Sequence, residues 1–252
     1  MAVKRVTARP VVRKAAKRPA VKRAAGAPDA VTWIIPSFGD PEGLEAGLGM
    51  LGLEGAPASA VVIVETGDTS LLAYMDVIRA QAALGRRVGA VYSRRGCLCG
   101  AVNRAAYAAG ASRSLCVISG RAVPQGAPLY GAVEAWLDRE APRPDDAAVG
   151  LFSPDGESCH RLFPLVSAGA VGRLGYLWHP VCMFRRLAER WLIDVAGMAG
   201  RLTAVPGVTI AQDGFDGREP DCDEYRECLL VYERHLPGIR RIDAGRIAGG
   251  RV

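Results

Sequence analysis

Beyond residue 30, the chain alternates between short apolar runs and longer stretches in which apolar or small residues recur at helical spacing. The apolar runs, which predict strands, cover residues 31–35, 60–64, 87–93 and 114–120. The stretches between them, which predict helices, cover residues 41–55, 71–85 and 100–112. Run 60–64 is continuously apolar, as in a parallel strand covered on both faces. The pattern predicts an α/β protein with a doubly wound, mostly parallel sheet and helices on both faces.

Polar and small residues follow each predicted strand. They read "PSFGD" at 36–40, "ETGD" at 65–68, "SRRG" at 93–96 and "SGR" at 119–121. Polar turns are common after strands, but the carboxyl ends of parallel strands meet at one edge, where α/β proteins bind ligands. We therefore expect a binding site at this edge.

The net charge of +6 belongs to the amino-terminal tail. Nine of the 32 basic residues precede Asp29, which leaves 23 basic against 26 acidic residues in the remainder. Residues 1–28 lack aromatic and periodic apolar residues, so we predict a disordered basic tail. Such a tail is a solvated extension, a contact for a polyanion such as nucleic acid or anionic lipid, or a targeting sequence.

The spacing of the cysteines and the length of the apolar runs indicate in which cellular compartment we expect the protein. Seven cysteines, with no CxxC pair among them, favour a reducing, cytoplasmic location. The sequence has no apolar run of about 18 residues, the length that a membrane span needs, so we expect no transmembrane segment.

Over about residues 31–155 the chain resembles the family two glycosyltransferases, which have the Rossmann-like GT-A fold. The motifs that carry the resemblance are, in order, "VTWIIPSFGDPEGLEAGLGML", "VVIVETGDTS", "SRRGCLCGAVNRAAYAAGAS" and "LCVISGRAVP". The stretch "PLYGAVEAWLDREAPRPDDAAVGLFSPDGE" is similar to the rhamnosyltransferase-like members. The resemblance implies a nucleotide-sugar-binding half at 29–155 and an acceptor-side half of the same domain at 156–252. It also implies a hexosyltransferase-type activity on a nucleoside-diphosphate sugar and an unknown acceptor.

The strand-end positions and the resemblance together indicate a substrate-binding set. Its members are Pro36, Ser37, Asp40, Glu65, Gly67, Asp68, Arg95, Gly96, Asn103 and Ser119. A carboxylate at Glu65 can accept a hydrogen bond from N3–H of uracil or thymine. Asp40 either holds a ribose hydroxyl or caps the next helix, Arg95 places a cation near a diphosphate, and Asn103 lies on a helix that approaches the nucleotide or simply packs closely.

Arg121 replaces a residue that the resemblance assigns to a metal. The family's two metal-binding aspartates correspond to Ser119 and Arg121 here, so the hard-cation site loses its carboxylates. We therefore expect no metal cofactor. Arg121 can instead neutralise a diphosphate and stabilise the leaving nucleoside diphosphate, which gives it a catalytic role.

In the carboxyl half, "DGFDGREPDCDEYREC" resembles the family segment that carries the general base. Asp223 and Glu224 occupy that position, with Asp221 as a weaker choice, and would deprotonate the acceptor hydroxyl in an inverting displacement. Acids at the start of a helix are also favoured by the helix dipole alone. The pairs Cys159–His160 and His179–Cys182 have zinc-ligand residue types, but their spacing favours core packing.

Three functions remain open from the sequence. They are a glycosyltransferase, a catalytically inactive GT-A-like scaffold with a binding role, and a nucleic-acid-associated protein that binds through its tail.

Overall fold

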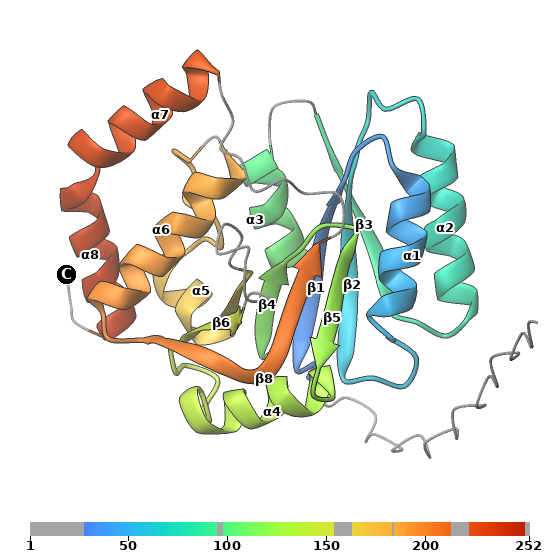
Figure 1. Cartoon of the computed structure of the whole chain (residues 1–252), viewed down its shortest axis with the longest axis horizontal. Helices are drawn as coiled ribbons and strands as arrows, with labels where there is room; N and C mark the ends of the chain where they lie inside the picture. Colours follow the sequence, from blue (N-terminus) through green and yellow to red (C-terminus); the bar gives the residue numbers. More distant parts are fainter. Residues whose placement is uncertain (1–27, 95–97, 154–162, 183, 213–221, 250–252) are drawn as a thin grey trace, which may run out of the picture.

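The computed structural model describes residues 28–94, 98–153, 163–182, 184–212 and 222–249, which form eight strands and eight helices (Figure 1). All but one residue of the predicted basic tail lies outside these ranges. So does the predicted boundary between the two halves, at 155–156.

The first half confirms each strand and helix that the sequence predicts. These elements are β1 (Val31–Ser37), α1 (Pro41–Met50), β2 (Ala58–Glu65), α2 (Leu71–Ala83), β3 (Val88–Ser93), α3 (Leu98–Ala108) and β4 (Ser114–Val117). Helix α1 ends earlier than predicted because Gly52 follows with a φ of 56°, in the left-handed region that glycine adopts readily.

Beyond β4, the described residues add four strands and five helices. They are β5 (Ala122–Gly126), α4 (Leu129–Glu140), β6 (Val149–Ser153), β7 (Pro164–Ser167), α5 (Ala168–Leu174), α6 (Arg185–Met198), β8 (Leu202–Gln212), α7 (Asp223–Arg234) and α8 (Pro237–Ala248).

All eight strands join one curled sheet in the order β3-β2-β1-β4-β7-β6-β8-β5. The pairings β2–β3, β1–β2, β1–β4 and β6–β8 are parallel, whereas β4–β7, β6–β7 and β5–β8 are antiparallel. Strands β1 to β4 are thus all parallel to one another, and their carboxyl ends lie at one edge. The predicted α/β fold with a mostly parallel sheet is confirmed.

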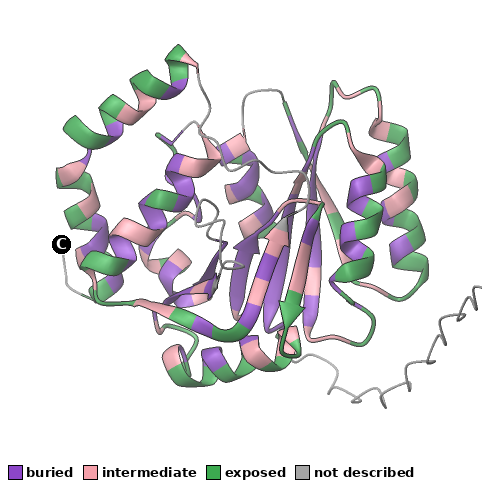
Figure 2. Ribbon diagram, viewed as in Figure 1, coloured by how far each residue is buried: buried purple, intermediate pink, exposed green. Residues whose placement is uncertain are grey.

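The sheet divides the apolar core into two layers. Side chains of β1 alternate between them: Trp33 and Ile35 belong to one cluster with α1, α2 and α4, whereas Ile34 belongs to the other with α3, α5, α6, α7 and α8. Figure 2 shows that burial is concentrated on the sheet and on the helix faces that cover it, while much of α7 is exposed. Helices therefore cover both faces, as predicted.

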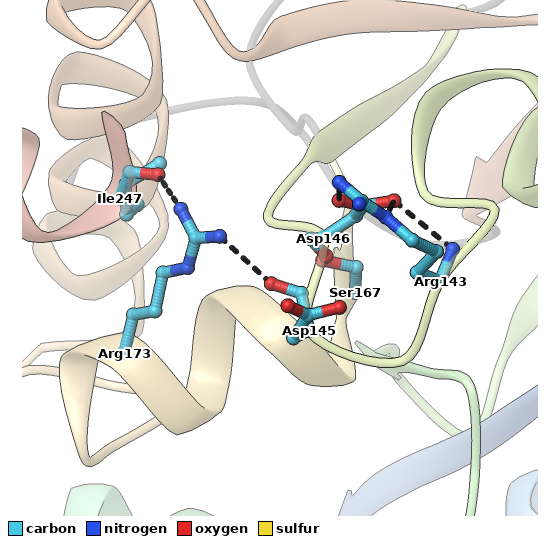
Figure 3. Close-up of polar contacts among 6 residues, drawn as sticks. All are labelled: Arg143, Asp145, Asp146, Ser167, Arg173 and Ile247. Carbon is cyan, nitrogen blue, oxygen red and sulfur yellow. Dashed lines mark hydrogen bonds and ion pairs between the residues drawn. The ribbon is translucent and has the colours of Figure 1, made fainter. Parts of the chain in front are cut away.

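A polar clamp joins α5 to the end of α8 and to the loop before β6 (Figure 3). The Arg173 guanidinium donates to the carbonyl oxygens of Ile247, at 2.7 Å, and Asp145, at 2.9 Å. Ser167 caps α5 by accepting from the Ala170 N–H, and its hydroxyl donates to the Asp146 carbonyl oxygen at 2.9 Å. The clamp thus fastens α5 to α8 and to the loop before β6.

Among the described residues, no helix has the length and apolar character required to cross a membrane.

Candidate functional site

The loops after β1 and β2 are fastened together at the carboxyl edge of the sheet. The Asp68 carboxylate accepts from the N–H groups of Gly39 and Ser70, both at 2.7 Å, and these bonds lower its pKa, the Ser70 bond most. The Asp40 N–H donates to the hydroxyl of buried Tyr74 at 2.6 Å. Asp68 therefore connects the loop after β1 to its own turn through hydrogen bonds to backbone N–H groups. Gly67 lies exposed in the same turn.

A cavity opens where β1 and β4 separate. Strand β1 pairs with β4 only as far as Ile34 and Val117, whereas its pairing with β2 continues through Pro36. Strand residues two apart direct their backbone groups to the same neighbour, so Pro36 faces the β4 side but has no N–H to offer. The cavity between the strand ends has a volume of about 240 Å³ and is lined by Pro36, Ser37, Phe38, Asp40, Ser119, Gly120 and Arg121.

Close backbone packing brings α1 against the turn 119–121. A Cβ atom at Gly47 would lie 1.8 Å from the carbonyl oxygen of Gly120, and a Cβ atom at Gly120 would lie 3.3 Å from the backbone of Leu44. The two glycines thus allow the contact between helix and turn. As a result, the amino terminus of α1 and Arg121 share the cavity.

Asp40 and Arg121 form an ion pair in the cavity. The Arg121 Nε donates to Asp40 Oδ2 at 2.7 Å, while Asp40 Oδ1 accepts from the Gly43 N–H at 3.0 Å and caps α1. The pKa of Asp40 lies below its usual value, chiefly because of the Arg121 hydrogen bond and, to a smaller extent, the Gly43 bond, while burial opposes both. The predicted helix-capping role of Asp40 is therefore present.

Two of the predicted binding residues have a buried oxygen with no hydrogen-bond partner among the described residues. They are Glu65, through Oε1, and Ser119, through its hydroxyl. Buried polar atoms are nearly always paired in folded proteins, because an unpaired one costs about 1–3 kcal/mol. Ser119 lines the cavity and Glu65 ends β2, so both oxygens lie at the carboxyl edge, where a ligand would supply the missing partners.

Asn103 acts within the protein. Its Nδ2 donates to the Trp178 carbonyl oxygen at 2.8 Å, and its Oδ1 accepts from the N–H groups of Leu177 and Trp178 at 2.9 Å. These bonds fasten α3 to the loop before α6. The contacts agree with the packing alternative, and nucleotide contact by Asn103 stays a prediction.

Among the described residues, Asp223 and Glu224 are not part of the cavity lining. Arg95 and Gly96 lie outside the described residues. Asp223 and Glu224 are exposed in the first turn of α7, where Asp223 pairs with Arg226 at 3.1 Å. Figure 1 places α7 apart from α1 and α2, beyond α6. Their role as general base stays a prediction.

Phe38 was missed by the sequence analysis. It lines the cavity and its side chain is 44% exposed, which leaves an aromatic face available for stacking. Phe38 lies in the turn "PSFGD", from which the predicted substrate-binding set takes Pro36, Ser37 and Asp40.

The candidate zinc residues show the features of packed side chains. His179 is buried and stacks on Trp191 at 4.1 Å between ring centroids, and burial lowers its pKa. Burial raises the pKa of Cys182 to about 12, so it is a neutral thiol at pH 7. Cys159 and His160 lie outside the described residues.

The two positions that the resemblance assigns to a metal have no carboxylate here, and the Asp40 carboxylate in the cavity lining is paired with Arg121. Ser119 offers a neutral hydroxyl and Arg121 a cation, and neither replaces the carboxylates that Mg²⁺ or Mn²⁺ prefer. Within the described ranges, no group of three or more His, Cys, Asp or Glu side chains is arranged to hold a metal ion.

Comparison with known proteins bears on the fold. No protein-family model matches the sequence, and no curated protein matches it. The mannosyltransferase PcManGT from Pyrobaculum calidifontis, solved in complex with GDP-Man and Mn²⁺, has a TM-score of 0.52 and 16% identity over 74% of this chain. TarS from S. aureus has a TM-score of 0.52 and 11% identity over 69% of this chain.

The chain spans 58% of the length of PcManGT and 34% of that of TarS. At these identities the likeness shows the fold alone. This chain has a Rossmann-like fold of the GT-A type.

Proposed function

We propose that this chain is a glycosyltransferase that transfers a sugar from a nucleoside-diphosphate sugar to an acceptor. The observation that carries the proposal is the cavity between the ends of β1 and β4. It contains Arg121 and the Ser119 hydroxyl, which has no partner in the part of the chain that the structure describes. A cation beside an unsatisfied hydroxyl suits a phosphate group, and the carboxyl edge of a parallel sheet is where such a ligand binds. The order of the sequence motifs supports assignment to the family two, rhamnosyltransferase-like enzymes.

The base and the diphosphate are recognised by different strand ends. Glu65 accepts a hydrogen bond from N3–H of uracil or thymine through its unpartnered oxygen, and Phe38 offers a stacking surface. Arg121 neutralises the diphosphate in place of a divalent metal. The negative charge on the nucleoside diphosphate grows as it leaves, so a fixed guanidinium stabilises the transition state more than the ground state.

Transfer proceeds with inversion at the anomeric carbon. Asp223 or Glu224 takes the proton of the acceptor hydroxyl, whose oxygen forms the new bond to the anomeric carbon as the bond to the diphosphate breaks. The resemblance of the surrounding segment to the family supports the general-base role, and the acceptor is bound by residues 156–252.

Titration with nucleoside diphosphates tests the function. We expect uridine or thymidine diphosphate to bind saturably, more tightly than guanosine diphosphate, with or without manganese, and the matching nucleotide sugars to be turned over. Binding without transfer or donor hydrolysis would indicate an inactive scaffold. Salt-sensitive nucleic-acid binding that disappears when residues 1–28 are removed, with no nucleotide binding, would replace the proposal by a nucleic-acid function.

A further inference from the structure

Asp40 makes two different contacts with its two carboxylate oxygens. Oδ1 accepts from the Gly43 N–H and caps α1, and Oδ2 accepts from the Nε of Arg121 at 2.7 Å. Both side chains line the cavity. One oxygen of the Asp40 carboxylate therefore bonds to α1, and the other bonds to Arg121.

The Asp40–Arg121 contact is open to solvent and can be exchanged. The side chains of Asp40 and Arg121 are 34% and 55% exposed. Ion pairs at such exposure contribute about 0.2–1 kcal/mol, so a ligand with stronger contacts can displace one partner. The helix cap, by contrast, is a contact between Asp40 and the backbone of its own helix, and it survives the exchange.

A single ligand can provide both an acceptor for Arg121 and a donor for Asp40. A guanidinium binds phosphate best through two parallel N–H donors, and Asp40 takes the Nε donor of one such edge. When a phosphate takes that edge, Oδ2 of Asp40 loses its donor and becomes an acceptor beside the ligand. A sugar hydroxyl is the donor that restores its hydrogen bond.

We propose that Asp40 and Arg121 form a latch in which the diphosphate takes Arg121 from Asp40 and a sugar hydroxyl of the same ligand takes its place on Asp40. This inference rests on the proposed function and adds the ligand class that the site selects. A nucleoside diphosphate satisfies both released groups. Inorganic pyrophosphate satisfies Arg121 alone and replaces the donor to Oδ2 of Asp40 with a neighbouring anion, while Oδ1 keeps the Gly43 N–H.

Asp40→Asn tests the latch, because asparagine caps a helix as well as aspartate but carries no charge to pair with Arg121. The measurement is the calorimetric affinity of inorganic pyrophosphate and of uridine diphosphate, for the wild type and the variant. We expect pyrophosphate to bind the variant more tightly, by about 1.4- to fivefold, which corresponds to the cost of opening an exposed ion pair. Uridine diphosphate should gain less, so the preference for it over pyrophosphate should fall.

Asp76→Asn is the matched control, since it removes the same charge from an exposed pair with Arg79 on α2, away from the cavity lining. It should leave both affinities unchanged. Asp40→Ser, which also caps a helix, repeats the test if the asparagine variant does not fold. Failure of both to fold would contradict the latch, because a weak exposed pair does not hold a fold together.

The remaining outcomes separate the latch from the function. If Asp40→Asn leaves the pyrophosphate affinity and the preference unchanged, the latch is wrong and the proposed function stands. If neither ligand binds the wild type, the proposed function and the latch both fail.

Discussion

The hydrogen bonds of individual residues distinguish two kinds of site residue. Some bond to other groups of the protein, and others have a polar atom available for a ligand. Asp68 and Asn103 have both ends of their side-chain groups engaged with backbone groups of the protein. The Oε1 of Glu65 and the hydroxyl of Ser119 are buried and without a partner among the residues that the structure describes. The second pair therefore contains the better candidates for ligand contact, although all four belong to the substrate-binding set predicted from the sequence.

Replacing Glu65 by alanine should change binding and stability in opposite directions. The variant loses a charge-assisted hydrogen bond to the base, which is worth about 1.5–3 kcal/mol, so uridine diphosphate should bind at least about tenfold more weakly. The protein itself loses a buried oxygen that has no partner, so its free energy of unfolding should stay level or rise. Calorimetry and urea denaturation measure the two effects. An unchanged dissociation constant in the folded variant would remove the base-recognition role.

Among the elements, α1 matters most to the site because it lies directly on the turn 119–121. The contact depends on Gly47, where a Cβ atom would lie 1.8 Å from the carbonyl oxygen of Gly120. A shift of this turn moves Ser119 and Arg121 together. The helix thus controls the shape of the cavity as well as supplying Asp40.

Gly47→Ala should destabilise the protein by about 1–3 kcal/mol, because the new methyl group must push the helix and the turn apart. Gly49→Ala is the matched control in the same helix, where a Cβ atom meets nothing within 4 Å. That change should stabilise the protein by up to about 1 kcal/mol through helix propensity. Urea denaturation measures both variants. Equal stabilities for the two alanine variants would show that α1 and the turn do not pack as described.

On the scale of the whole molecule, the parts that could be predicted from the sequence are those with local signals. Continuous apolar runs and helical spacing predicted the four parallel strands and the helices between them, and the turns after those strands predicted the edge where the cavity lies. The pairing of β5 with β8 carries no such signal. Neither does the contact between Asp40 and Arg121, which are 81 residues apart. Contacts of this kind depend on how elements pack, and a single sequence does not record that.

The position of Asp223 and Glu224 shows the same limit. Their residue types and their place at the start of a helix were predicted, and α7 does begin at Asp223. Which face of the molecule that helix occupies depends on its packing against α8 and against Trp191 of α6. The sequence therefore predicted a helix that begins at the acid pair, but it did not predict how far that helix lies from the cavity.

The most direct test of the central claim is the affinity of a nucleoside diphosphate for the wild type and for Arg121→Ala, measured calorimetrically in excess chelator and again with manganese. If Arg121 binds the diphosphate in place of a metal, the wild type should bind equally well under both conditions. Arg121→Ala should bind about 10- to 100-fold more weakly, the loss of a charge-assisted hydrogen bond of about 1.5–3 kcal/mol. Binding that disappears with chelator and returns with manganese, or an alanine variant that binds as tightly as the wild type, would contradict the account.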